Sequence, residues 1–289
     1  MSLIQYDAGL SELIESSAVE RIAGRNEFTE GPAWHPDGYL LYSDIPANRI
    51  CFWTEEGVKT YRKPSGNANG LVFDRELRLV ACEHGNRRVS RTERDWSVVA
   101  IAERFEGKRL NSPNDVVVRS DGTIYFTDPP YGVEAKDREL DFQGVYRIAP
   151  DGELTVAVRD FDKPNGLAFS PDEQTLYIED SGRKHIRALR VSPDGTLSDS
   201  RLLAEMRSTY PGSPDGMKID VDGRVWCTGA EGLWVFDPSG TRLGILALPE
   251  KPSNCCWGDP DRHTLFITAR SSVYRVRSRV AGVDVLGAK

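Results

Sequence analysis

The chain has 289 residues, of which 39% are hydrophobic and 28% charged, and both fractions are ordinary for a globular protein. Its 37 basic and 44 acidic residues give a net charge of −7, which argues against a nucleic-acid binder, because such proteins neutralise phosphates with a basic face. No run of about 18 apolar residues predicts a membrane-spanning helix, and Met1 to Gly24 lacks the basic start and apolar core of a secretory signal. We therefore expect a cytoplasmic protein that binds neither nucleic acid nor membrane.

The first residues differ from the rest of the chain. Residues 1–15 predict a short helix or a loose arm, and residues 16–289 predict a single domain. The five cysteines are odd in number and have no CxxC spacing, so a disulfide framework or a cysteine zinc site is not indicated. If Cys255 and Cys256 lie in a strand, their side chains point to opposite faces.

One sequence unit recurs six times along the chain. Each copy has a small or polar residue, a short apolar run, a turn rich in Pro, Asp and Gly, and a second run of β-branched and aromatic residues. Such a unit predicts two strands joined by a tight hairpin. The copies are EGPAWHPDGYLLYSD from Glu30, NGLVFDRELRLVACE from Asn69, NDVVVRSDGTIYFTD from Asn114, NGLAFSPDEQTLYIED from Asn165, DGMKIDVDGRVWCTG from Asp215 and SNCCWGDPDRHTLFITA from Ser253.

The copies start 39, 45, 51, 50 and 38 residues apart, and a second, less regular hairpin follows each one. This period is typical of four-stranded propeller blades. We therefore predict an all-β fold, a six-bladed β-propeller with antiparallel blades around a central channel. The last blade has too short a second hairpin, and Ala18 to Gly24 could supply its outer strand and close the ring. The alternative is a β-sandwich or two small β-domains, which six in-phase copies without a linker do not favour.

In a propeller the first strand of each blade lines the channel, so the first residues of the six copies should meet at one mouth. All six carry a side-chain oxygen, although strand starts are often polar for turn reasons alone. The six positions are Glu30, Asn69, Asn114, Asn165, Asp215 and Ser253.

Two carboxylates brought together in a channel need a cation or protons to neutralise them. Carboxylate and amide oxygens, without His or Cys, suit Ca²⁺ best. Mg²⁺, Mn²⁺ and Zn²⁺ are the alternatives, and a further alternative is that these side chains bond only the channel backbone and water. The ends of the second strands should ring the same mouth, where four acids would deepen a negative field. Those positions are Asp44, Glu83 with His84 beside it, Asp128, Asp180, Gly229 and Ala269.

At this point the sequence resembles the SMP-30/gluconolactonase/LRE family, the regucalcin-like propellers, and its bacterial gluconolactonase branch in particular. The motifs that carry the resemblance are FTEGPAW (Phe28–Trp34), ACEHGNRRVSR (Ala81–Arg91), RLNSPNDVVVRSDGTIYFTDPPYG (Arg109–Gly132), KPNGLAFSPD (Lys163–Asp172) and SPDGMKID (Ser213–Asp220). The resemblance implies a six-bladed fold with a catalytic divalent metal. It places the metal ligands on Glu30, Asn165 and Asp215, with Asn114 as a fourth ligand or a close neighbour.

The function that follows is metal-assisted hydrolysis of a lactone, a sugar lactone above all. Asp215 is the expected general base for the attacking water, and His84 is the alternative base. Contacts to substrate are expected from Asn69, Asn114, Asp128 and Tyr131. In the animal branch of the family an Arg two residues before the position of Asn114 contacts substrate, and here that position is Ser112, which leaves the substrate open.

Two other functions remain open. The same metal site could serve a related esterase, a phosphotriesterase or a non-sugar lactonase, or the protein could be a non-catalytic calcium-binding propeller. A serine hydrolase is disfavoured because GxSxG is absent, and no P-loop or GxGxxG indicates a nucleotide cofactor. The expected partner is a small lactone or ester, and the expected assembly is a monomer or weak homodimer.

Overall fold

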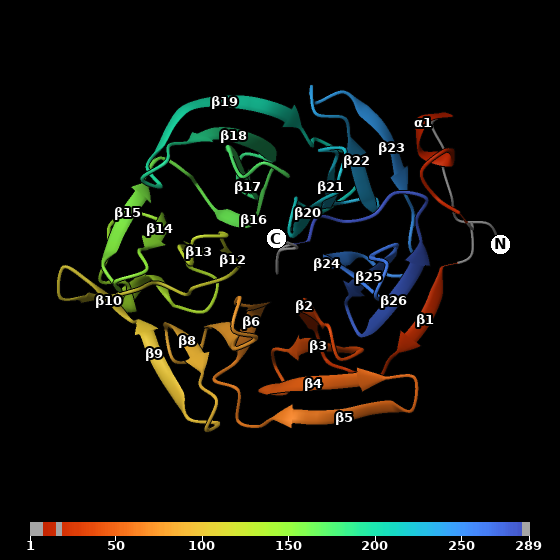
Figure 1. Cartoon of the computed structure of the whole chain (residues 1–289). Helices are drawn as coiled ribbons and strands as arrows, with labels where there is room; N and C mark the ends of the chain where they lie inside the picture. Colours follow the sequence, from red (N-terminus) through yellow and green to blue (C-terminus); the bar gives the residue numbers. More distant parts are fainter. Residues whose placement is uncertain (1–7, 16–18, 285–289) are drawn as a thin grey trace.

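The computed structural model of the chain describes residues 8–15 and 19–284. Six four-stranded antiparallel sheets stand around a central axis, which confirms the predicted six-bladed β-propeller (Figure 1). In each blade the first strand lies nearest the axis and the fourth lies at the rim.

The first three blades follow one another in chain order. Blade 1 contains β2 (Thr29–His35), β3 (Tyr39–Asp44), β4 (Arg49–Thr54) and β5 (Gly57–Arg62). Blade 2 contains β6 (Ala68–Phe73), β7 (Leu79–Glu83), β8 (Arg88–Thr92) and β9 (Val98–Ala102). Blade 3 contains β12 (Val116–Val118), β13 (Ile124–Asp128), β14 (Gly144–Ile148) and β15 (Leu154–Val158).

The remaining blades complete the ring. Blade 4 contains β16 (Pro164–Phe169), β17 (Thr175–Asp180), β18 (His185–Val191) and β19 (Leu197–Glu205). Blade 5 contains β20 (Met217–Ile219), β21 (Val225–Thr228), β22 (Leu233–Phe236) and β23 (Arg242–Leu246). Blade 6 contains β24 (Pro252–Gly258), β25 (Thr264–Ala269), β26 (Ser272–Arg277) and β1 (Glu20–Ala23). Outside the blades lie α1 (Ala8–Ser11), the hairpin of β10 (Arg104–Phe105) and β11 (Lys108–Arg109), and the 3₁₀ helix η1 (Ala135–Asp137).

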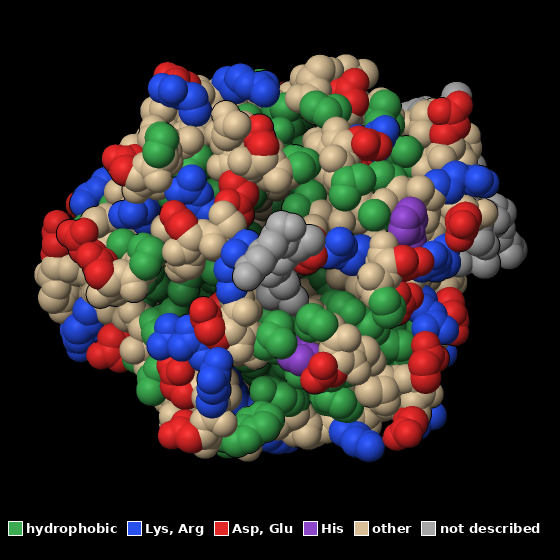
Figure 2. Space-filling model, viewed as in Figure 1, with side chains coloured by type: hydrophobic (Ala, Val, Ile, Leu, Met, Phe, Trp, Pro, Cys, Tyr) green, Lys and Arg blue, Asp and Glu red, His purple; other side chains and the backbone are tan. Residues whose placement is uncertain are grey.

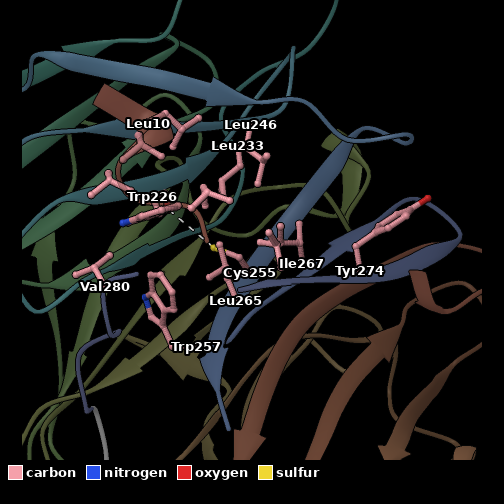
Figure 3. Close-up of a cluster of buried hydrophobic side chains, with 14 of the residues drawn as sticks. Leu10, Trp226, Leu233, Leu246, Cys255, Trp257, Leu265, Ile267, Tyr274 and Val280 are labelled. Atoms are coloured by element: carbon pink, nitrogen blue, oxygen red, sulfur yellow. Dashed lines mark hydrogen bonds between the residues drawn. The ribbon is translucent and has the colours of Figure 1, made fainter. Parts of the chain in front are cut away.

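The hydrophobic core is divided among the six gaps between neighbouring blades. Each of six clusters of buried side chains draws on two adjacent blades. Figure 3 shows the cluster between blades 5 and 6, where Trp226 packs edge-on against Trp257 with ring centroids 5.3 Å apart. Cys255 belongs to this cluster and Cys256 to the one between blades 6 and 1, so the two thiols do point to opposite faces of β24.

The ring closes as the sequence predicts. β1 pairs antiparallel with β26, so the first strand of the chain becomes the outer strand of the last blade. Ala23 lies opposite Val273 in this ladder and packs with Trp53 of blade 1. The pairing gives β26 a partner on both edges, which the short hairpin of blade 6 could not supply by itself.

The N-terminal segment forms the short helix α1 rather than a loose arm over its described part, and residues 1–7 lie outside the described residues. Leu10 and Ile14 are buried in the cluster between blades 5 and 6. The carbonyl of Leu13 accepts a hydrogen bond from the Arg279 amide at 2.8 Å. Within residues 8–15 and 19–284, no helix combines the length and apolarity needed to cross a bilayer.

The channel ends differently on the two faces of the ring. At the end away from the inner-strand starts, the Val283 amide bonds the carbonyl of Ile219 at 3.1 Å. A cavity of about 320 Å³ lies at this end, lined by inner-strand residues such as Trp34, Phe169 and Trp257 and by Val283. It includes none of the six predicted channel-mouth residues. In the view of Figure 2, acidic and basic side chains are interspersed around the rim.

Candidate active site

The predicted channel-mouth residues lie at one end of the six inner strands. In blades 1, 2, 4 and 6 they are the first or second residues of their strands, whereas Asn114 and Asp215 stand two residues before β12 and β20. Five of the six side chains are buried, because neighbouring blades crowd the axis, and Asp215 is half-buried. The residues are Glu30, Asn69, Asn114, Asn165 and Ser253 among the buried polar groups, and Asp215 beside them.

The structure brings together the acids and the amide that the sequence selected as metal ligands. The Asn165 Nδ2 donates to Asp215 Oδ1 at 2.8 Å, although the two residues are 50 positions apart. Glu30 of blade 1 interacts electrostatically with Asp215 of blade 5, with blade 6 between the two blades. Blades 1, 4 and 5 therefore contribute oxygen-bearing side chains to one place on the axis.

Two further channel residues, Asp115 and Asn254, were not predicted. Asn254 Nδ2 donates to Glu30 Oε2 at 3.1 Å and reaches Asp115 Oδ2 at 3.4 Å, so it bridges two acids. Both residues stand one position after a predicted channel residue, where the other four blades have glycine. A side chain at Gly216 would collide with Asn254, with a Cβ only 2.1 Å from its Cγ. The break in this glycine pattern is the sequence signal that could have identified them.

Burial shifts the pKa values of the channel carboxyls upward. Burial, together with the nearby charges of Asp215 and Asp115, raises the pKa of Glu30 well above its ordinary value. Burial also raises the pKa of Asp215 to about 7, against the opposing effects of the Asn165 hydrogen bond and the positive charge of Lys251. These acids are therefore costly to ionise together unless a cation joins them.

The structure supports a positioning role for His84 better than a role as a base. Its Nε2 lies 3.2 Å from Nδ2 of Asn69, so the imidazole nitrogen accepts a hydrogen bond from the amide. Burial lowers the pKa of His84 to about 4, and the ring is neutral and weakly basic at neutral pH. His84 and Asn69 thus form a buried pair beside the channel, with His84 fixing the amide.

Tyr131 lies near Asn165 and Ser181 at the channel mouth. Its hydroxyl interacts with Ser181 and Asn165, while its side chain stays 46% exposed. The Gly132 amide donates to Ser112 Oγ at 2.9 Å, which fixes the turn that carries Tyr131. Tyr131 is therefore placed to contact a molecule bound above Asn165.

The four acids at the ends of the second strands do not deepen the field at the mouth, and this expectation is wrong. Each is buried and neutralised by hydrogen bonds or by arginine. Asp44 pairs with Arg49 at 3.0 Å, and Glu83 pairs with Arg88 at 2.7 Å. Asp180 accepts four backbone N–H groups and pairs with Arg183.

Asp128 follows the same rule and is not available to a sugar hydroxyl. Its two carboxylate oxygens accept the backbone N–H groups of Asn111 at 2.8 Å and Ser112 at 2.7 Å. The side chain is fully buried, and burial raises its pKa to about 7. Asp128 therefore holds the loop that leads to Asn114, because strand alternation turns the last residue of the second strand toward this loop.

The donor set fits a divalent cation. Within the described residues, no three His, Cys, Asp or Glu side chains are grouped as a metal site. The predicted set is of another kind, because two of its members are carboxylates and the others are the amides of asparagines. Buried carboxylates with raised pKa values and no bridging arginine are what a hard cation would neutralise. Glu30, Asp215, Asn165 and Asn114 are the residues that could hold it.

Comparison with known proteins identifies the family to which the chain is similar. Residues 28–271 match the SMP-30/Gluconolactonase/LRE-like region. A gluconolactonase of Zymomonas mobilis is 37% identical over 92% of this chain and 83% of its own length. A pentonolactonase of Haloferax volcanii is 31% identical over 83% of this chain and 80% of its own. The solved structure of a gluconolactonase from Xanthomonas campestris superposes with a TM-score of 0.86 at 37% identity, covering 95% of this chain and 93% of that one.

Proposed function

Because the chain belongs to the SMP-30/gluconolactonase/LRE-like family, we propose that it is a lactonase that adds water to a sugar lactone and releases the open hydroxy acid. The observation that carries the proposal is the meeting of Glu30, Asn165 and Asp215, from three blades, at one buried place on the axis. The similarity to gluconolactonases and to a pentonolactonase makes an aldonolactone the first substrate to test.

The proposed cofactor is one divalent cation, with Ca²⁺ as the first choice, because the donors are carboxylate and amide oxygens. Glu30, Asn165 and Asp215 would hold it, and Asn114 would complete or support the set. When bound, the cation supplies Lewis-acid polarisation of the lactone carbonyl and stabilises the negative charge that forms on its oxygen.

Asp215 is the proposed general base. Its Oδ1 is held by the Asn165 amide, so its orientation is fixed, and Oδ2 is the atom that we assign to the proton of the attacking water. A carboxylate held in a fixed orientation can accept the proton of a water molecule placed beside it. The ring oxygen of the lactone leaves as the hydroxyl of the product, so water is the only co-reactant.

Asn69 and Tyr131 are the proposed contacts to sugar hydroxyls. The amide of Asn69 is oriented by His84, and the hydroxyl of Tyr131 stands over Asn165 at the mouth. Oriented polar groups around a buried reaction centre discriminate between substrates that carry hydroxyls and those that lack them. A sugar lactone should therefore be preferred over an aliphatic lactone of the same ring size.

The proposal is tested with purified protein, Ca²⁺ and a panel of lactones. Asp215→Asn and Glu30→Gln should each lower kcat/KM for gluconolactone by at least about a thousandfold, because each removes a channel carboxylate. Asp151→Asn, in the exposed β14–β15 turn, is the matched control and should keep wild-type rates. Wild-type rates in both channel variants would refute the assignment.

The panel also separates the alternatives. Faster turnover of an organophosphate or an aliphatic ester than of any sugar lactone would indicate the related esterase. Tight Ca²⁺ binding without turnover of any ester would indicate a non-catalytic calcium-binding propeller.

A further inference from the structure

A row of side-chain hydroxyls links neighbouring blades just below the channel mouth. Thr127 Oγ1 accepts the Asp115 amide at 3.2 Å and donates to the carbonyl of Asn165 in the next blade at 2.8 Å. Thr228 repeats both bonds, accepting from Gly216 at 2.9 Å and donating to the carbonyl of Ser253 at 2.7 Å. A hydroxyl suits this position because it both accepts and donates a hydrogen bond.

In blade 4 the equivalent position is Glu179. Its Oε1 accepts the Gly166 amide at 3.0 Å, as a threonine there would. A carboxylate cannot donate, and the bond to the next blade comes instead from Ser181, whose Oγ donates to the carbonyl of Pro214 at 2.7 Å. Ser181 Oγ also lies 3.3 Å from Glu179 Oε1, so the two side chains together replace one hydroxyl residue.

This replacement brings the pair against two of the proposed cation ligands. Ser181 Oγ lies 3.3 Å from Asn165 Nδ2, which also donates to Asp215. The same hydroxyl holds the carbonyl of Pro214, directly before Asp215. With its Nδ2 turned toward Ser181 and Asp215, the Asn165 amide has its Oδ1 on the other side.

Glu179 is a costly residue in the cation-free protein. It is fully buried, and its Oε2 has no hydrogen-bond partner among the described residues. Burial, with the neighbouring charge of Asp215, raises its pKa well above the ordinary value. Glu83 is equally buried in blade 2, but Arg62 and Arg88 pair with it at 3.1 Å and 2.7 Å. A residue that departs from the repeat and does not stabilise the fold is expected at a functional site.

We propose that Glu179 is a positioning residue of the channel site, which strengthens cation binding through its negative charge and holds Asn165 through Ser181. This inference rests on the proposed function, because it takes the channel to bind a divalent cation. A bound cation would offset the repulsion between Glu179 and Asp215. Glu179 would therefore lower the stability of the protein without the cation and raise the stability of the protein with it.

The test compares Glu179→Gln and Glu179→Thr with Glu83→Gln as the matched control. Glutamine removes the charge at constant shape, and threonine restores the hydroxyl that Thr127 and Thr228 supply at this position. Ca²⁺ affinity of the metal-stripped full chain is measured by titration calorimetry, and its Tm is measured without Ca²⁺ in mildly alkaline buffer.

Both Glu179 variants should bind Ca²⁺ roughly tenfold more weakly, because one buried charge near the site is lost. Their Tm without Ca²⁺ should rise by about 2 °C or more, since an unpaired carboxylate has gone. Glu83→Gln should keep wild-type Ca²⁺ affinity and lower the Tm, because Arg62 and Arg88 lose a partner. A merely structural role for Glu179 would lower its Tm in the same way.

Unchanged Ca²⁺ affinity in Glu179→Gln, or a fall in Tm like that of Glu83→Gln, would overturn the inference alone. A wild-type chain that binds no divalent cation would overturn the proposed function and this inference with it. Asp215→Asn serves as the reference for lost binding, so the two failures are distinguishable.

Discussion

The acids of this protein fall into two kinds, according to how many hydrogen-bond donors surround each carboxylate. Asp180 accepts backbone N–H groups from Asp162, Lys163 and Arg183, and these bonds lower its pKa although burial alone would raise it. Glu30 and Asp215 have few donors, and their pKa values are raised. An acid of the first kind is ionised near neutral pH and holds a loop through its hydrogen bonds. Acids of the second kind need a cation or protons to offset their charge, which fits the proposed cation site.

The pH dependence of stability tests the buried state of His84. Its pKa is about 4 in the folded chain and ordinarily 6.5, so between these values the unfolded chain binds more protons. His84 therefore contributes its full stabilising effect above pH 6.5, and this effect is lost as the pH falls toward 4. The difference is worth roughly 3 kcal/mol.

His84→Gln should consequently lose less unfolding free energy than the wild type when the pH is lowered from 6.5 to 4, as measured by urea denaturation. Glutamine keeps a hydrogen-bonding group beside Asn69 but does not titrate. Parallel losses in the two proteins would show that His84 is not buried in the neutral form.

Residue identity at the site was predictable where the repeat was regular and not where it was broken. Aligning the copies found Glu30, Asn165 and Asp215, because one register places them all on the axis. Asp115, Asn254 and Glu179 each stand where most other blades have glycine or a hydroxyl residue. Asp128 was misassigned, because the sequence places it at the correct end of the channel but does not show which backbone groups its carboxylate satisfies.

Among the elements, β1 closes the ring by completing the sheet of blade 6. The sequence predicted it because blade 6 lacked an outer strand, and its four residues alone would indicate little. The helix α1 is too short for periodicity to define, and its packing depends on Leu10 and Ile14 meeting a cluster made by blades 5 and 6. The positions of β1 and α1 therefore depend on contacts with distant segments, which the local sequence pattern does not show.

A charge placed in β1 tests the importance of this closure. Ala23→Asp would bury an unpaired carboxylate beside Trp53 and Val273, and should lower the free energy of unfolding by about 3 kcal/mol. Ala100→Asp, on the exposed side of the outer strand β9 in blade 2, is the same substitution in a similar place and should change stability by less than about 0.5 kcal/mol. Equal effects in thermal melts would mean that β1 does not seal the ring.

At the scale of the whole molecule, the proposed ligands come from blades 1, 4 and 5 and, with Asn114, from blade 3. A cation on the axis would therefore join blades that are not all neighbours in the ring, as the contact between Asn254 of blade 6 and Asp115 of blade 3 already does. The repeat made this arrangement predictable, since the fold class fixes which strand ends meet. Which acids are neutralised by arginine was not predictable, because those pairs depend on rotamers and loop paths.

Cation binding should thus raise the stability of the whole ring. At a Ca²⁺ concentration 100 times the dissociation constant, the stabilisation is about 2.7 kcal/mol, equivalent to a rise of about 5 °C in Tm. A chelator should reverse the rise in the wild type and have no effect on Asp215→Asn. If neither Ca²⁺ nor a chelator changes the Tm of the wild type, the protein has no cation site built from several blades.

The pairing of β1 with β26 also constrains how the protein is made. Glu20 and Arg275 are 255 residues apart, yet their side chains bond at 2.7 Å across this ladder. β1 is the first of the blade strands in chain order and β26 is the last, so the growing chain leaves this sheet unfinished until β26 emerges from the ribosome. Pairing between such distant strands is slow, because the chain loses conformational entropy in closing the loop before the contacts between the strands compensate for that loss. The nascent protein therefore carries an open seam until β26 has been synthesised.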